Sequence, residues 1–140
     1  MKLVKLTILI VFVSHSFFSC HAQNSKVSGS TEATSENIEV YYFHFTNRCV
    51  TCNAVESETK MVIETFYADE MKEGKIEFKS VNLDESEGKN LAKSLRVSGQ
   101  TLLLVKGKKR VDLTSQGFMN ARINPEKFQK VLQNNFDKLL

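Results

Sequence analysis

The chain has 140 residues, with 19 basic and 16 acidic side chains and a formal net charge of +3. If residues 1–22 are removed, two lysines leave with them, and the remaining 17 basic and 16 acidic side chains give a charge of +1. This near balance excludes the strong electrostatic attraction on which general nucleic-acid binding depends, so nucleic acid is not an expected partner.

Residues 1–22 have the composition of an export signal. Lys2 and Lys5 form a positively charged n-region, an apolar run extends from Leu6 to Val13, and Ala22 ends a segment with small residues at the cleavage positions. The apolar run is shorter than the roughly 20 residues that a membrane-spanning helix requires. We therefore expect an exported protein, and Ala22 marks a first candidate cleavage site.

A second candidate cleavage site lies within the same segment. The sequence Phe17-Phe18-Ser19-Cys20 resembles a relaxed lipoprotein signal, in which a small residue precedes a cysteine that becomes lipidated. Cleavage before Cys20 would give a membrane-anchored lipoprotein, whereas cleavage after Ala22 would give a free periplasmic protein. We favour the lipoprotein, attached to the membrane through Cys20, and both hypotheses place the chain outside the cytosol.

Two regions follow the signal. Residues 23–36 are small and polar and contain no aromatic side chain, which predicts a flexible linker. Residues 37–140 have the length of one domain and alternate strand-like with helix-like patterns. The predicted elements are a strand at 38–45, a helix from Cys52 to about Gly74, a strand at 75–82, a helix at 87–95, strands at 101–105 and 110–113, and a helix from Asn124 onward. Residues 106–109 are predicted to form a turn and residues 114–119 a loop.

The order of these elements predicts an α/β fold. The first strand, helix and strand form a βαβ unit with parallel strands, and the last two strands are close enough in sequence for an antiparallel hairpin. The apolar stripes of all the helices are buried if a mixed central sheet of about four strands has helices on both faces.

The most informative motif is Cys49-Val50-Thr51-Cys52, which follows the first predicted strand and leads into the first predicted helix. Two cysteines at this spacing form a redox-active disulfide or bind a soft metal ion. A disulfide that closes so short a loop restricts the unfolded chain only slightly. We therefore interpret the pair as reactive rather than structural. Cys20 belongs to the export signal, so this pair provides all the cysteines of the predicted domain.

These features resemble the thioredoxin-like fold superfamily over residues 38–140. The resemblance is carried by the strand Val40–Phe45, the Cys49–Cys52 motif and the strand Gln100–Val105. Two shorter stretches resemble small exported thioredoxin-like proteins of Bacteroidetes that are labelled as a nitrophenyl compound nitroreductase subunit associated with arsenic resistance. They are F-T-x-R-C-x-T-C-x-A-V-E, from Phe45 to Glu56, and T-x-x-G-F-M, from Thr114 to Met119.

The chain departs from thioredoxins at several positions. Arg48 replaces the usual tryptophan before the first cysteine, and Val50-Thr51 replaces the usual Gly-Pro. Gln100 stands where thioredoxins have a cis-proline, and a cis peptide without proline costs about 2.5–4 kcal/mol, so we expect a trans peptide there. Phe43 stands in place of the buried aspartate that relays protons. The dithiol itself is retained.

The position of the motif predicts a different role for each cysteine. Backbone N–H groups and the helix dipole favour a thiolate at a helix N-terminus, so Cys49 is predicted to attack, and Arg48 adds a positive charge beside it. Cys52, about one turn inside the helix, is predicted to resolve the mixed disulfide. We therefore expect a thiol–disulfide oxidoreductase that needs no cofactor. Its expected partners are protein thiols or disulfides, or a membrane electron donor.

Three further residues are candidate substrate contacts. The resemblance places Gln100 and Thr101 at the loop that pairs with substrates in thioredoxins, although the same residues could simply begin a strand. Phe118, in the predicted loop, is a candidate docking residue, and packing into the core is the alternative.

Two other functions are compatible with the dithiol. A structural zinc site needs four ligands, and with one C-x-x-C pair no metal site is predicted, even with His44 nearby. Two thiolates can still bind a soft ion or arsenite, which gives a non-enzymatic alternative. The other alternative is an accessory thioredoxin-fold subunit of a reductase complex. The sequence contains no G-x-G-x-x-G fingerprint for a nicotinamide or flavin cofactor.

Overall fold

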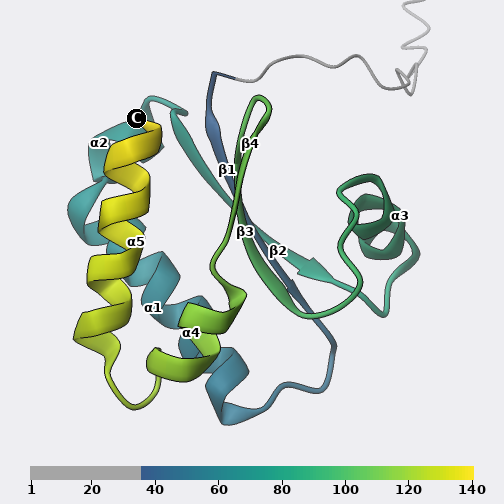
Figure 1. The fold of residues 1–140 in the computed structure, drawn as a ribbon. Helices are drawn as coiled ribbons and strands as arrows, with labels where there is room; N and C mark the ends of the chain where they lie inside the picture. Colours follow the sequence, from purple (N-terminus) through teal and green to yellow (C-terminus); the bar gives the residue numbers. More distant parts are fainter. Residues whose placement is uncertain (1–35) are drawn as a thin grey trace, which may run out of the picture. The chain divides into compact units, whose positions relative to one another are not determined.

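The computed structural model describes residues 36–140. The predicted export signal, the lipidation of Cys20 and all but the last residue of the predicted linker lie outside this range. Figure 1 shows the ribbon, with the elements β1 (Ile38–His44), α1 (Val50–Phe66), α2 (Ala68–Lys72), β2 (Ile76–Asn82), α3 (Ser86–Ser94), β3 (Thr101–Lys106), β4 (Lys109–Asp112), α4 (Thr114–Asn120) and α5 (Pro125–Leu139).

Four strands form one mixed sheet in the order β2-β1-β3-β4. β1 pairs in parallel with β2 and antiparallel with β3, and β4 completes a hairpin with β3 around the turn at Gly107. This is the arrangement that the sequence predicts: a parallel βαβ unit followed by an antiparallel hairpin. The predicted α/β fold with a mixed four-stranded sheet is confirmed.

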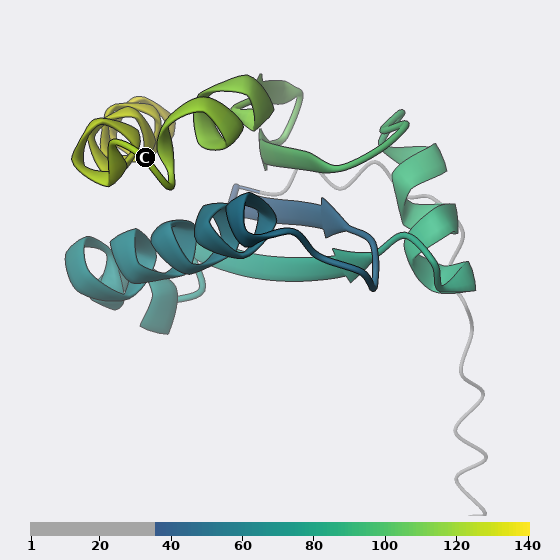
Figure 2. The ribbon, with the colours of Figure 1, turned by 90° about the horizontal axis from the view of Figure 1, so that it is seen from below.

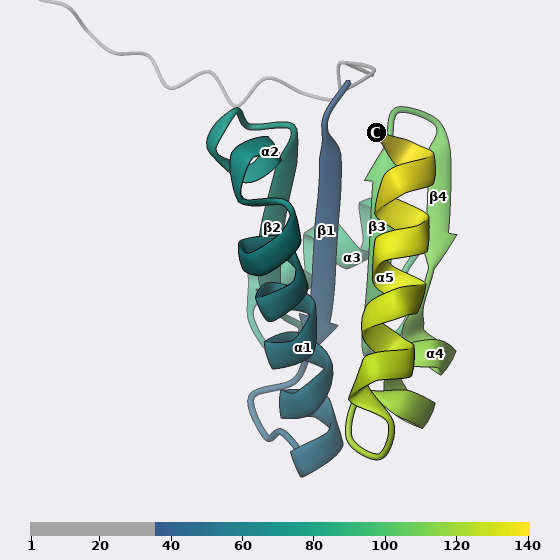
Figure 3. The same ribbon diagram turned by 90° about the vertical axis from the view of Figure 1, so that its left-hand side faces the viewer.

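Helices cover both faces of the sheet. Figure 1 shows α1 and α5 on one side of the strands and α3 on the other, and Figure 3 shows α1 and α5 side by side in front of the sheet. Seen from below in Figure 2, α1 lies beside β1 and β2, while α4 and α5 lie beside β3 and β4. This layering gives the apolar faces of α1, α3 and α5 a sheet surface on which to pack.

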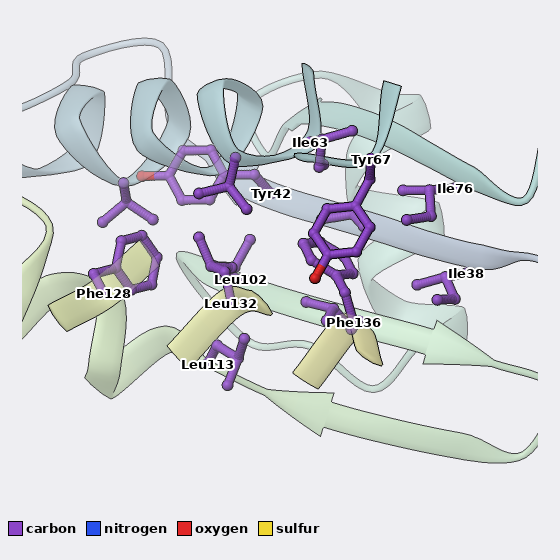
Figure 4. Close-up of a cluster of buried hydrophobic side chains, with 14 of the residues drawn as sticks. Ile38, Tyr42, Ile63, Tyr67, Ile76, Leu102, Leu113, Phe128, Leu132 and Phe136 are labelled. Carbon is purple, nitrogen blue, oxygen red and sulfur yellow. The ribbon is translucent and has the colours of Figure 1, made fainter. Parts of the chain in front are cut away.

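The two faces of β1 belong to two different apolar clusters because successive strand residues point to opposite sides. Val40 and Tyr42 belong to the larger cluster, with side chains of α1, α5 and β3, part of which is drawn in Figure 4. Tyr41 and Phe43 belong to the smaller cluster, which includes Ala92 of α3. Both faces of β1 are therefore buried, as expected for a central strand.

The prediction of a single helix between Cys52 and Gly74 is wrong, because the helix breaks at Tyr67 into α1 and α2. Tyr67 has φ −130° and ψ 30°, which is not helical, and its buried ring packs against Phe136 of α5 with ring centroids 5.0 Å apart. Its hydroxyl donates to the Asp137 carboxylate at 2.6 Å. The residue at which α1 ends is thus held against the last helix. The predicted glycine terminator is confirmed, since Gly74 has φ +72° after α2.

The loop predicted at residues 114–119 is also wrong, because these residues form α4. Its helical conformation depends on tertiary packing: Gly117 lies so close to α1 that a Cβ atom there would be 3.1 Å from a methyl group of Val55. No helix within residues 36–140 is long and apolar enough to cross a membrane.

Candidate redox-active site

Cys49 is the N-cap residue of α1. Its backbone is extended, with φ −79° and ψ 164°, and its Sγ accepts a hydrogen bond from the backbone N–H of Cys52 at 3.2 Å. Its carbonyl oxygen accepts from the N–H of Asn53 at 3.1 Å, which closes the first helical turn. α1 thus begins at Val50, two residues before the predicted start, and the Cys49 sulfur occupies the position of a capping acceptor.

The two cysteines form a disulfide, with their Cα atoms 5.1 Å apart. Cys49 is exposed at the end of the helix, whereas Cys52 is 2% exposed. An incoming sulfur therefore reaches Cys49 first, and Cys52 is reached mainly from within the protein. This difference in access matches the predicted roles of attacking and resolving cysteine.

Two side chains contact Cys52, one from β1 and one from the residue just before β3. The hydroxyl of Tyr42 on β1 donates to the Cys52 carbonyl oxygen at 2.9 Å. Burial raises the pKa of the Tyr42 phenol to about 12, so it stays a neutral donor at physiological pH. The Gln100 side chain places its Oε1 atom 3.1 Å from the Cys52 Sγ. Cys52 is therefore contacted at both its backbone and its sulfur.

Arg48 is engaged by residues on α1 and β2. Its guanidinium forms an ion pair with Glu56, donates to the Ser80 hydroxyl at 3.2 Å, and lies 5.8 Å from the centre of the Tyr42 ring. The Glu56 carboxylate also accepts from Lys60 at 2.8 Å. These contacts fix the residue immediately before Cys49. The predicted tuning of Cys49 by the Arg48 charge stays a prediction, because Glu56 balances part of that charge.

Glu56 is buried, with 8% of its surface exposed. Burial alone would raise the pKa of the Glu56 carboxyl, but hydrogen bonds from Lys60, Arg48 and Ser80, together with the charge of Arg48, hold it below its usual range. Glu56 is therefore an ionised anchor for the loop before Cys49. Its spacing to Lys60 is that of an ordinary surface pair, so its sequence pattern does not indicate burial.

A second anchor holds the start of the same loop. The backbone N–H of Thr46 donates to the Asp84 carboxylate at 2.8 Å, and the Asn82 side chain donates to the Thr46 hydroxyl at 3.0 Å. The hydrogen bond from the Thr46 backbone lowers the pKa of the Asp84 carboxyl. Asp84 is exposed to solvent. In the structure it ties the loop before the cysteines to the end of β2.

The structure brings Gln100 to the cysteines but places the other two candidate substrate contacts differently. Thr101 begins β3 opposite Phe43, and its hydroxyl donates to the Gly99 carbonyl oxygen at 3.0 Å. Phe118 lies on α4 and packs, partly buried, against the larger core cluster, which is the alternative noted from the sequence. Substrate contact by these two residues stays a prediction. No peptide bond within residues 36–140 is cis, so the bond before Gln100 is trans.

His44 is buried at the end of β1, with its Nδ1 atom 2.9 Å from the Phe45 carbonyl oxygen. Within residues 36–140, no three side chains of histidine, cysteine, aspartate or glutamate are grouped so as to hold a metal ion.

The sheet order, the helices on both faces and the C-x-x-C pair at the N-terminus of α1 define a thioredoxin-like α/β fold. No family model and no curated protein matches the sequence. Among solved structures, the chain is similar to the germline-specific thioredoxin Deadhead of Drosophila melanogaster, with 21% identity and a TM-score of 0.48 over 78% of this chain and 87% of that one.

Two other solved thioredoxins are similar at the same level. The Malassezia sympodialis thioredoxin has 17% identity and a TM-score of 0.47 over 72% of this chain and 79% of that one. The Thermus thermophilus thioredoxin has 21% identity and a TM-score of 0.42 over 73% of this chain and 75% of that one.

Proposed function

We propose that this chain is an exported thiol–disulfide oxidoreductase in which Cys49 attacks and Cys52 resolves. One observation carries the proposal: a disulfide joins an exposed cysteine at the N-cap of α1 to a cysteine that is 2% exposed. A purely structural disulfide does not require this difference in access.

The proposed reaction conserves sulfur, protons and electrons. The Cys49 thiolate attacks one sulfur of a substrate disulfide, that S–S bond breaks, and a mixed disulfide forms while the first substrate thiolate leaves and takes up a proton. Cys52 then loses its proton and attacks the Cys49 sulfur. The Cys49–Cys52 bond forms, the mixed disulfide breaks, and the second substrate sulfur leaves as a thiol. The substrate is reduced by two electrons and the protein is oxidised, and the reverse sequence oxidises a dithiol.

The surroundings of Cys49 support its role as nucleophile. The N–H of Cys52 is directed at the Cys49 Sγ at 3.2 Å, and the free N–H groups of the first turn of α1 add to the positive end of the helix dipole. Both stabilise a sulfur anion more than a neutral thiol. The pKa of a free cysteine is about 8.5, so a modest decrease gives a substantial thiolate fraction at neutral pH.

Equilibration of the purified protein with glutathione redox buffers tests the proposal. The dithiol and the disulfide should interconvert, with a midpoint reduction potential of about −270 mV for a reductase or about −120 mV for an oxidant. Cys52→Ser should trap a mixed disulfide on Cys49, and Cys49→Ser should form none. If the wild-type pair exchanges with glutathione in neither direction, the oxidoreductase proposal fails. Stoichiometric arsenite or Cu(I) binding that is lost in Cys49→Ser would then support the dithiol-binding alternative.

We also propose that the chain is a lipoprotein anchored through Cys20. The support is the sequence alone: the charged and apolar segment of residues 1–22 and the Phe17-Phe18-Ser19-Cys20 pattern. An inhibitor of lipoprotein signal peptidase should cause the precursor to accumulate, and Cys20→Ala should release the protein from membranes. Processing that is unaffected by the inhibitor would exclude lipidation and leave the free periplasmic form.

The resemblance to the exported proteins labelled as nitroreductase subunits adds a finer proposal, in which the domain serves a reductase complex. Its support is the sequence alone, in the two stretches that carry the resemblance, Phe45 to Glu56 and Thr114 to Met119. Affinity purification from the native source tests it. A partner that is retained by Cys49→Ser would indicate docking that does not depend on the thiol, and isolation of the protein alone would exclude a stable complex.

A further inference from the structure

The side chain of Gln100 lies directly against the resolving cysteine. Its Oε1 atom is 3.1 Å from the Cys52 Sγ. The sheet explains how residues 48 positions apart meet. Thr101 on β3 pairs with Phe43 near the end of β1. The residue before Thr101 therefore lies beside the carboxyl end of β1, where the chain leaves the strand and leads into α1.

The hydrogen-bonding capacity of Cys52 depends on its oxidation state. A thiol carries one S–H donor, which an amide oxygen can accept, whereas a disulfide sulfur has no proton to donate. Cys52 is 2% exposed, so water offers its S–H little competition with the Gln100 oxygen. The Gln100 carbonyl can therefore stabilise Cys52 in the dithiol and in the mixed disulfide, but it has no equivalent interaction with the Cys49–Cys52 disulfide.

We propose that Gln100 is a positioning residue for Cys52, whose amide oxygen accepts the Cys52 S–H and thereby shifts the dithiol–disulfide equilibrium toward the dithiol. The inference deepens the proposed function and rests on it, because it assigns a regulator of the redox equilibrium at the same pair. It differs from the predicted role of this position in substrate contact, since the side chain faces the protein's own sulfur.

The same contact affects the resolving step. An amide oxygen can accept a hydrogen bond but is not a base, so Gln100 keeps Cys52 protonated in the mixed disulfide. When Cys52 attacks Cys49, the Cys52 S–H bond breaks, its hydrogen bond to Gln100 is lost, and in the net reaction the proton appears on the departing substrate thiol. Gln100 should therefore slow resolution by stabilising the neutral thiol, and it should raise the reduction potential of the pair.

Three variants test the proposal through the glutathione equilibrium. Gln100→Leu keeps a similar volume but removes the acceptor, and it should lower the equilibrium constant for reduction by about fivefold, which corresponds to a potential about 20 mV more negative. Gln100→Glu supplies a stronger, charged acceptor and should shift the potential in the opposite direction. Gln129→Leu makes the same chemical change on α5, where the amide donates to Glu58, and should leave the potential unchanged.

The pattern of shifts decides the outcome. Equal potentials for the wild type, Gln100→Leu and Gln100→Glu would overturn the proposal while leaving the oxidoreductase function intact. A rise in Gln100→Leu with a fall in Gln100→Glu would also overturn it, since that pattern places the amide N–H groups against the sulfur.

A second measurement separates this proposal from the proposed function, because it requires no exchange reaction. In a Cys49→Ser background, the absorbance of the Cys52 thiolate can be followed against pH. Gln100→Glu should raise the pKa of Cys52 above its value in the Cys49→Ser protein that keeps Gln100, since a carboxylate stabilises the thiol and repels the thiolate. An unchanged or lower pKa would contradict the Gln100 assignment, whether or not the wild-type protein exchanges with glutathione.

Discussion

The Glu56 carboxylate pairs with the Arg48 guanidinium, so a residue in the second turn of α1 holds the residue that immediately precedes the exposed cysteine. The pair is completed by Lys60 on the same helix and by Ser80 on β2. A buried carboxylate is stable here because cationic and hydroxyl donors surround it. The loop that presents Cys49 is therefore fixed by charge as well as by helix capping.

Glu56→Gln should destabilise the fold and leave the Arg48 charge unbalanced. We expect a loss of about 1–3 kcal/mol in the free energy of unfolding, because a hydrogen-bonded charge loses its partner. The freed positive charge beside Cys49 should lower the pKa of that thiol. Urea denaturation and the absorbance of the thiolate measure the two effects. Glu64→Gln, an exposed position on the same helix, is the control and should change neither. A stable variant with an unchanged Cys49 pKa would exclude this role for the ion pair.

The lowered pKa of Glu56 also predicts a pH dependence of stability. In the folded state the carboxyl titrates below its ordinary value of 4.5, so the unfolded chain binds the proton more readily than the folded one. The stability contributed by Glu56 is then complete above about pH 5 and decreases as the pH falls from the ordinary value through the folded pKa. Wild-type stability should therefore drop over this range more than that of Glu56→Gln. If the unfolding free energies of the two proteins ran parallel over this pH range, the lowered pKa of Glu56 would be contradicted.

The secondary structure that follows from local pattern was largely predictable. The alternating and apolar runs identified all four strands, and Gly74 marked the end of the helical region because only a residue that tolerates positive φ fits there. Cys49 and Cys52 were assigned opposite roles from their positions relative to the helix start. In the structure Cys49 is exposed and Cys52 is buried, and the two roles stay a prediction.

Features that depend on residues distant in sequence were not predictable. The break at Tyr67 depends on Asp137, 70 residues later, and the contact of Cys52 with Gln100 spans 48 residues. The burial of Glu56 requires β2 to supply Ser80. Nothing in the local patterns around these residues specifies which distant side chain will face them. The sequence therefore located the two cysteines, and the resemblance placed Gln100 near them, but the contact of its side chain with Cys52 was not predicted.

Gly88 should tolerate no larger residue. A Cβ atom there would lie 1.9 Å from the Asn82 carbonyl oxygen, a backbone atom at the end of β2 that cannot move without disturbing the sheet. We expect Gly88→Ala to cost at least about 2 kcal/mol of unfolding free energy, more than alanine returns in helix propensity. Gly99→Ala is the matched control, since a Cβ atom there meets nothing within 4 Å. Equal denaturation midpoints for the two variants would show that α3 can shift away from β2.

The reduced protein should be alkylated at one cysteine long before the other. Cys49 is exposed and its sulfur accepts a backbone hydrogen bond at the positive end of α1, so iodoacetamide at pH 6 should modify it faster than a free thiol. Cys52 is 2% exposed and adjoins a carbonyl oxygen, which together disfavour both access and ionisation. Mass spectrometry of each cysteine-containing peptide against time gives the two rates, and Cys49→Ser reports Cys52 alone. Equal rates, or a Cys49 rate no higher than that of a free thiol, would remove the basis for assigning attack to Cys49 and resolution to Cys52.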